Sequence, residues 1–147
     1  MIRTVRIDAT YNLAAQALWR NVVRYDALEA MMSGKLVRVK CPDGEERVGH
    51  DVPLVFLLFG VAPVGRWRFK VVARDDDRFR LRSEESGTGV RRWAHEVAIE
   101  RIDDNSCRLT DTIEIDAGAL TPLVAWFARR EYERRHRLRT RMLAAEQ

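Results

Sequence analysis

Cysteine, lysine and proline are scarce in this chain of 147 residues. The two cysteines, Cys41 and Cys107, stand in no CxxC or Cys/His spacing, so the sequence predicts neither a disulfide framework nor a cysteine-based metal site. We interpret both as small buried side chains in a reducing compartment. No low-complexity linker and no internal repeat divides the chain. These absences favour one domain that spans residues 1–147 and builds its core without covalent crosslinks.

Sequence motifs for cofactors and for targeting are also missing. There is no GxGxxG, Walker or nucleophile-elbow motif and no set of residues at metal-ligand spacing, so we expect no cofactor and no metal. Residues 1–6 alternate apolar and charged side chains, unlike a signal or transit peptide. We therefore expect a cytoplasmic protein.

The charge is mildly basic, with 26 Lys plus Arg against 22 Asp plus Glu and a net charge of +4. Only three of the cations are lysines, and the arginines are spread along the chain instead of forming a nucleic-acid-binding tail. Residues 129–141 are the densest stretch, but Glu131 and Glu133 are interleaved at helical spacing. This segment is either a solvated helix face or an anion-binding face.

The periodicity of the apolar residues predicts an α+β fold. Residues 2–10 alternate as in a strand, and helical spacing follows in two short segments that end before Gly34. From residue 35 to 117 the period returns to two, with turn signals that indicate about six antiparallel strands. Thr121-Pro122 then predicts the start of a long helix, from Leu123 to about Leu143. A curved antiparallel sheet of about seven strands would pack against this helix and leave a cavity between them.

The alternation within each strand predicts which side chains face that cavity. The inward set is apolar and aromatic except for His95 and Asp111, which the strand register places opposite or diagonal to each other, within contact distance. Such a pair is either a satisfied core pair or a hydrogen-bonding or acid/base group. The inward residues on the strands are Trp67, Phe69, Val71, Phe79, Leu81, Trp93, His95, Val97, Asp111 and Ile113.

The long helix allows two inward faces. One stripe runs from Leu123 through Phe127 to Glu131, which would place charge in the middle of the seam. The rival stripe, a third of a turn away, is Val124, Ala128 and Tyr132. On the first phase, Phe127 and Glu131 join the predicted ligand site.

Residues 52–64 are apolar at both strand phases, unlike the other strands. Two prolines and a length of thirteen residues exclude a membrane-spanning helix. The second apolar face would be buried under the short helices, in a homodimer or in a transient membrane contact. We predict that Leu54, Phe56 and Phe59 border the mouth of the cavity.

The order of elements, together with Leu58-Phe59-Gly60, Arg92-Trp93-Ala94-His95 and Leu109-Thr110-Asp111, resembles the SRPBCC or START-like superfamily. Within it, the sequence is most similar to the bacterial polyketide cyclase/dehydrase-like branch. The resemblance covers nearly the whole chain. It implies a helix-grip fold, in which the curved sheet wraps around the C-terminal helix, a small apolar ligand and no obligatory cofactor.

Three functions follow from these observations. The first is binding or transport of a small hydrophobic molecule, such as a lipid, polyketide or sterol, in the cavity. The second is a cofactor-free cyclase or dehydratase in which His95 and Asp111 are the candidate catalytic residues. The third is a membrane or protein-partner module that uses residues 52–64 and the arginine-rich helix. Nucleic acid is not expected, because the sheet aromatics lie on the face that the helix covers.

Overall fold

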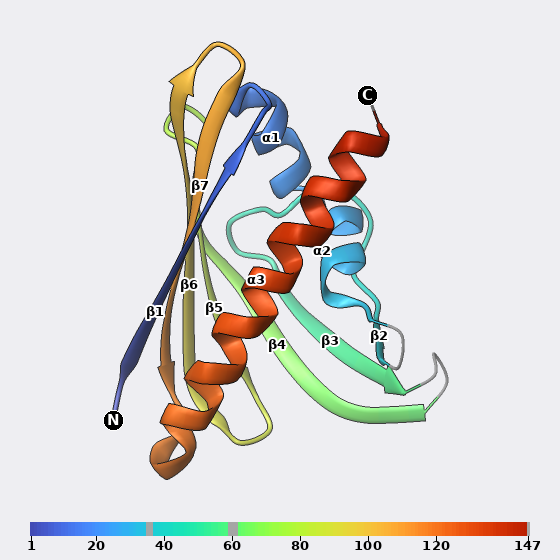
Figure 1. Ribbon diagram of the computed structural model, residues 1–147. Coiled ribbons are helices and arrows are strands. Elements are labelled where there is room, and N and C mark those ends of the chain that lie inside the picture. Colours follow the sequence, from blue (N-terminus) through green and yellow to red (C-terminus); the bar gives the residue numbers. More distant parts are fainter. Residues whose placement is uncertain (35–36, 59–61, 147) are drawn as a thin grey trace.

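The computed structural model describes residues 1–34, 37–58 and 62–146. For residues 37, 55–58 and 62–64 it describes the backbone alone. Its strands form one antiparallel sheet in the order β1-β7-β6-β5-β4-β3-β2 (Figure 1). The strands are β1 (Arg3–Tyr11), β2 (Val37–Val39), β3 (Asp51–Leu58), β4 (Ala62–Asp75), β5 (Arg80–Gly87), β6 (Val90–Asp103) and β7 (Ser106–Asp116).

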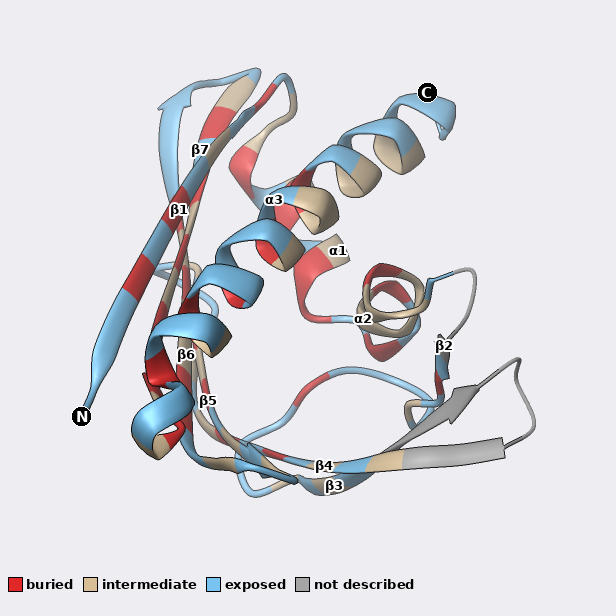
Figure 2. Cartoon of the chain, turned by 60° about the horizontal axis from the view of Figure 1, so that its bottom comes forward, coloured by how far each residue is buried: buried red, intermediate tan, exposed pale blue. Residues whose placement is uncertain are grey.

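Two short helices and one long helix lie on the same side of this sheet. They are α1 (Ala15–Val22), α2 (Tyr25–Met32) and α3 (Thr121–Ala145), and a single 3-10 turn (Gly118–Leu120) precedes α3. Figure 2 shows that the sheet curves around α3 and that α2 lies between the far end of the sheet and that helix. The predicted α+β, helix-grip architecture is confirmed, including the two short helices after the first strand.

The strand phases predicted from the sequence are correct along β6 and β7, and along β4 as far as Val71, where a bulge reverses the phase and leaves Ala73 exposed. Along β7 every second residue from Cys107 to Ile115 is buried, and the alternate positions are partly or fully exposed. The concave side of the sheet therefore forms the core, which divides into two clusters. One lies under α1 and α2 around Leu18, Val71 and Leu109, and the other lies under the first half of α3 around Ile113 and Ala128.

The inward face of α3 is the rival stripe. Ala125, Ala128, Tyr132 and His136 are buried, whereas Phe127 is 60% exposed. The prediction that Phe127 lines the cavity is therefore wrong. The stripe that starts at Leu123 faces away from the sheet. The small side chains of Ala125 and Ala128 face the sheet instead, and they allow α3 to approach β1 closely.

Phe79 also differs from its prediction. The strand β5 starts one residue later, and Phe79 occupies the turn before it with a positive φ of 55°. Its ring packs on Trp19, with the ring centroids 5.8 Å apart. Phe79 thus belongs to the core under α1 and does not line the cavity described below.

Trp67 and Trp93 lie on the concave side, as their strand phase predicts, and pack edge to face with their ring centroids 5.4 Å apart. Trp67 lies directly over Gly87, where a Cβ atom would approach Trp67 Cε3 to 2.2 Å. Glycine at this position is what allows the indole to lie flat against β5. The two tryptophans fill the space beneath the start of α3 and beside the cavity.

The apolar segment 52–64 falls partly outside the described residues. Leu54 is buried, Phe59 lies outside the described residues, and the side chain of Phe56 is likewise not described. Among the described helices, none combines the length and apolarity that crossing a membrane requires.

Candidate functional site

A small cavity of about 50 Å³ lies between the sheet, α2 and the second half of α3. Its apolar wall is formed by Val22, Leu28, Met31, Met32, Phe69, Leu81 and Val97. Its polar wall is formed by Glu46, Ser83, Glu85, His95, Asp111, Tyr132, Arg135 and Arg139. An enclosed space lined by apolar groups on one side and ionisable groups on the other is typical of a ligand or active site.

His95 and Asp111 are in contact, as the strand phases predict. Val97 is the residue directly opposite Asp111, so His95 is its diagonal neighbour. The His95 Nε2 to Asp111 Oδ1 distance is 2.6 Å. This hydrogen bond fixes the orientation of the imidazole ring at the cavity wall.

A second histidine, His136, completes the cluster from α3, although the sequence pattern did not place it in the predicted site. His136 Nε2 lies 2.7 Å from Asp111 Oδ2, although its N–H is not aligned well enough for a linear hydrogen bond. His136 Nδ1 lies 2.6 Å from the Tyr11 hydroxyl. Asp111 therefore links β1, β6 and α3 through two imidazole rings.

The contacts of this cluster determine its protonation. Burial alone raises the pKa of Asp111, but the contacts with His136 and His95 outweigh burial and hold the pKa below its usual value of 3.8. Asp111 is thus a carboxylate at pH 7, which accepts a hydrogen bond from His95 Nε2 and lies in contact with His136 Nε2. Burial raises the pKa of the Tyr11 phenol, so Tyr11 keeps its proton at pH 7 and its hydroxyl is hydrogen-bonded to His136 Nδ1.

The other nitrogen of His95 faces a second carboxylate. His95 Nδ1 lies 4.0 Å from Glu85 Oε1. Glu85 is held in place by two donors, Ser83 Oγ at 3.0 Å and Trp67 Nε1 at 2.6 Å. The imidazole is therefore anchored at Nε2, while Nδ1 makes no direct hydrogen bond in the described part of the chain and can meet a ligand.

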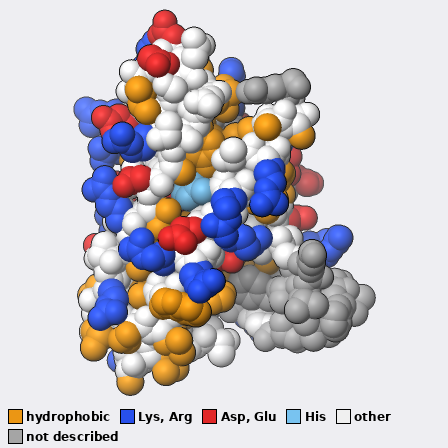
Figure 3. Space-filling view, viewed as in Figure 1, with side chains coloured by type: hydrophobic (Ala, Val, Ile, Leu, Met, Phe, Trp, Pro, Cys, Tyr) orange, Lys and Arg blue, Asp and Glu red, His pale blue; other side chains and the backbone are white. Residues whose placement is uncertain are grey.

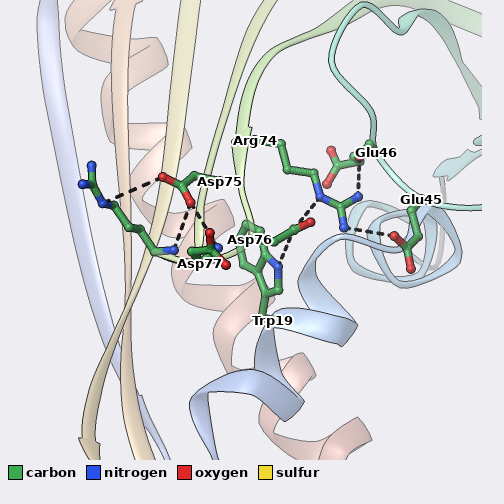
Figure 4. Close-up of polar contacts among 8 residues, drawn as sticks. Trp19, Glu45, Glu46, Arg74, Asp75, Asp76 and Asp77 are labelled. Carbon is green, nitrogen blue, oxygen red and sulfur yellow. Dashed lines mark hydrogen bonds and ion pairs between the residues drawn. The ribbon is translucent and has the colours of Figure 1, made fainter.

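Glu46 reaches the cavity from the loop that precedes β3. Arg74 on β4 holds this loop: it donates to the Glu46 carbonyl at 2.7 Å and to the Glu45 carboxylate at 3.0 Å (Figure 4). Asp76 fixes the same guanidinium at 2.8 Å and accepts a hydrogen bond from Trp19. Within the described residues, no donor hydrogen-bonds to the buried side-chain carboxyl of Glu46.

This environment favours the neutral form of Glu46. Burial is the largest cause and the nearby Glu85 the next, and together they raise the pKa of Glu46 well above 4.5 despite Arg74 and Arg139. A carboxyl group with this pKa can donate a proton or a hydrogen bond near neutral pH.

We expect Glu46→Gln to stabilise the protein, most strongly above pH 7. The folded state binds the Glu46 proton more tightly than the unfolded state, so the contribution of Glu46 to stability falls as pH rises from 4.5 through the raised pKa. Gln cannot ionise and avoids this loss. Each unit by which folding raises a pKa corresponds to about 1.4 kcal/mol once the group ionises, so the gain at alkaline pH should be about 1 kcal/mol or more, or about 2 to 4 °C in Tm.

Thermal unfolding from pH 5 to pH 9 tests this expectation. Glu133→Gln is the matched control, because Glu133 is exposed on α3 and, among the described residues, forms no ion pair. A gain that is equal at all pH values, or a loss at pH 9, would contradict the raised pKa of Glu46.

The helix contributes a positive charge to the same wall. Arg135 lies over the Tyr132 ring, with its guanidinium carbon 4.5 Å from the ring centroid, and pairs with Glu131 at 3.2 Å. Glu131 also pairs with Arg134 at 2.6 Å. The carboxylate of Glu131 thus orients the arginines and does not line the cavity itself.

The structure brings together only part of the predicted ligand site. Phe69, Leu81, His95, Val97 and Asp111 line the cavity. Val71 and Ile113 are fully buried in the core, and Trp67 and Trp93 pack beside the cavity.

Sequence reasoning missed the polar residues of the site, which are Tyr11, Glu46, Ser83, Glu85 and His136. Ser83 and Glu85 share the inward phase of Leu81, so extending that strand by four residues would have found them.

Solved structures with the same arrangement identify the fold. A START superfamily protein from Mycobacterium smegmatis matches with a TM-score of 0.74 and 12% identity over 98% of this chain and 99% of that chain. A protein from Rhodobacter sphaeroides matches with a TM-score of 0.78 and 15% identity over 98% and 94%. The Zhui aromatase/cyclase from Streptomyces sp. R1128 matches with a TM-score of 0.64 and 18% identity over 99% and 93%. The chain therefore has the SRPBCC or START-like fold, as its sequence resemblance predicts.

Within this fold the chain belongs to one sequence family. Residues 9–143 match the model described as domain of unknown function DUF8410, and the protein is a member of that family. None of the curated proteins compared with the chain matches it.

Proposed function

We propose that this protein binds a small amphipathic molecule in the cavity between the sheet and α3. The single observation that carries the proposal is the convergence of His95, Glu85 and Glu46 on one side of a cavity whose other side is apolar. The apolar wall would hold the body of the ligand, and the polar groups would orient a hydroxyl, carbonyl or amine. The likeness of the fold to a START superfamily protein and to an aromatase/cyclase supports this proposal.

The cavity volume limits the size of the ligand. A volume of about 50 Å³ holds a few water molecules, whereas pockets for drug-sized ligands measure about 300 to 1,000 Å³. A lipid, polyketide or sterol therefore requires α2 to move outward, since Leu28, Met31 and Met32 close the cavity on that side. The hydrogen bond from Arg134 Nη2 to the Met31 carbonyl, at 2.8 Å, is the polar link between α3 and α2 that such a movement would break.

A variant with a filled cavity tests the proposal. Leu28 is partly buried at the cavity wall, so Leu28→Trp should fold and occupy the ligand space. We expect it to weaken binding of the fluorescent probe 1-anilinonaphthalene-8-sulfonate by about tenfold or more, a usual cost of steric misfit in an apolar pocket. Mass spectrometry of small molecules extracted from the wild type should reveal a compound that this variant lacks.

Leu13→Trp is the matched control, because Leu13 is also partly buried but lies outside this cavity. Equal probe affinity in wild type, Leu28→Trp and Leu13→Trp would reject the cavity as the binding site.

An enzymatic function is the second candidate, and the pairing of a proton acceptor with a proton donor favours it. His95 is anchored by Asp111 and offers Nδ1 as a base, while burial keeps Glu46 protonated as an acid at the same cavity. In a dehydration, His95 would take a proton from a carbon next to a carbonyl. Glu46 would then protonate the departing hydroxyl, which leaves as water.

The extracted compound distinguishes the two functions. If the protein is a cofactor-free cyclase or dehydratase, fresh wild-type protein should convert that compound or its precursor, with loss of water visible by mass spectrometry. His95→Gln should bind the compound but not convert it. A compound that is bound and released unchanged supports binding alone.

A further inference from the structure

Large apolar side chains are exposed at the end of the molecule where α3 begins. Ile2, Leu120, Leu123, Trp126 and Phe127, which we call the α3 entry patch, are each 56% to 61% exposed. With Met1 they make up six of the eight exposed large apolar side chains among the described residues. Figure 3 shows hydrophobic side chains gathered over this lower end of the molecule.

The patch is continuous in space. Leu120, Leu123 and Phe127 follow one another at helical spacing, and Trp126 lies beside Leu123 on the same turn. The chain start joins them, because Thr121 Oγ1, in the first turn of α3, lies 3.4 Å from the Met1 carbonyl. Single exposed apolar residues are common, but a contiguous group of this kind marks a contact surface.

Three arginines surround the patch. Arg129 and Arg130 follow it on α3, and the Arg91 guanidinium lies beside Gly118 just before the helix. In the part of the chain that the structure describes, none of the three forms an ion pair with a carboxylate. The Arg130 guanidinium carbon lies 5.0 Å from the Trp126 ring centroid, so cation and indole act as one unit.

We infer that the α3 entry patch docks on the surface of a bilayer that contains anionic lipids. Tryptophan prefers the boundary between headgroups and acyl chains, and leucine and phenylalanine can insert below it. Arginines around the inserted side chains match the negative charge of such a surface.

A second copy of the chain fits this surface less well. A two-fold contact would place the same patch on both partners and would bring the arginines of both copies into one interface. Asp116, just before the 3-10 turn, already accepts a hydrogen bond from the Gly118 amide and lies 3.9 Å from the Met1 amino group. Like charges without carboxylates to pair with them oppose such a dimer.

The patch is separate from the proposed ligand site. It occupies the first two turns of α3, whereas the cavity is lined from Tyr132 onward. Membrane docking can therefore fail while ligand binding holds, and the reverse is also true.

Co-sedimentation of the full chain with vesicles tests the inference. We expect binding to vesicles of phosphatidylcholine with phosphatidylglycerol, much weaker binding to phosphatidylcholine alone, and loss of binding at high salt. Leu123→Ser with Phe127→Ser should weaken binding about tenfold or more, because these side chains would no longer be buried in the bilayer. Arg129→Gln with Arg130→Gln should weaken it about 25-fold, at about fivefold for each lost charge.

Ile102→Ser and Arg80→Gln are the matched controls. Ile102 is an exposed apolar residue near the β6–β7 turn, at the opposite end of the molecule (Figure 1), and Arg80 is an exposed arginine on β5. No binding to anionic vesicles, or equal binding by the patch variants and these controls, would overturn the inference. A protein that is dimeric in sedimentation and becomes monomeric in the patch variants would assign the surface to a second copy instead.

Discussion

Asp111→Ala should lower the free energy of unfolding by about 2 to 6 kcal/mol at pH 7. The substitution removes the carboxylate that accepts a hydrogen bond from His95 and contacts His136, and each buried polar group left without a partner costs about 1 to 3 kcal/mol. Chemical denaturation monitored by tryptophan fluorescence measures this loss.

Two further variants make the Asp111 result specific. Glu114→Ala, on the exposed face of the same strand, removes a surface ion pair with Arg92 and should cost less than about 1 kcal/mol. Asp111→Asn keeps the size of the side chain, but its amide can accept from only one imidazole while the NH2 faces the other. We expect a smaller loss than for alanine. A loss no greater for Asp111→Ala than for Glu114→Ala would show that the cluster contributes nothing to stability.

Combined replacements separate the structural role of the cluster from its functional role. Asp111→Leu with His95→Leu, His136→Leu and Tyr11→Phe removes all four polar groups, and apolar replacement of a complete buried polar cluster is often neutral or stabilising. If stability returns while binding of the extracted compound is lost, the cluster is kept for the ligand. If the variant regains stability and also binds the extracted compound, the role of the cluster is structural.

The sheet could be predicted in detail because a strand has only two phases. Once Leu109 is taken as inward, every second neighbour on β7 follows, and the His95–Asp111 contact results from either register. The same argument could not find Glu46, because it lies in a loop with no periodicity and its burial depends on the distant Arg74.

A helix gives no such binary choice. Leu123 and Phe127 form a stripe as apolar as Val124 and Ala128, and a rotation of a third of a turn exchanges them. Close packing of α3 on β1 favours small alanines on the inward face of the helix. The composition of the helix alone does not reveal this packing. His136 was missed for the same reason: on the wrong phase it is one more polar residue among exposed arginines.

Tyr132→Ala and Phe127→Ala compare these two phases directly. Tyr132 is 4% exposed; its ring centroid lies 5.0 Å from that of His95 and 6.4 Å from that of Trp93. Truncation of this side chain should lower the free energy of unfolding by about 3 to 5 kcal/mol, as for other buried aromatic residues. Phe127→Ala should change stability by less than about 0.5 kcal/mol, because the ring lies at the surface.

The Tyr132 variant should also widen the cavity, since the lost ring is part of its polar wall. We therefore expect Tyr132→Ala to bind 1-anilinonaphthalene-8-sulfonate more tightly than the wild type while unfolding at lower denaturant. Tyr132→Phe keeps the ring and should lose less than about 1.5 kcal/mol, as volume-conserving changes do. Equal losses from Tyr132→Ala and Phe127→Ala would contradict the packing of α3, and with it the cavity on which the proposed function rests.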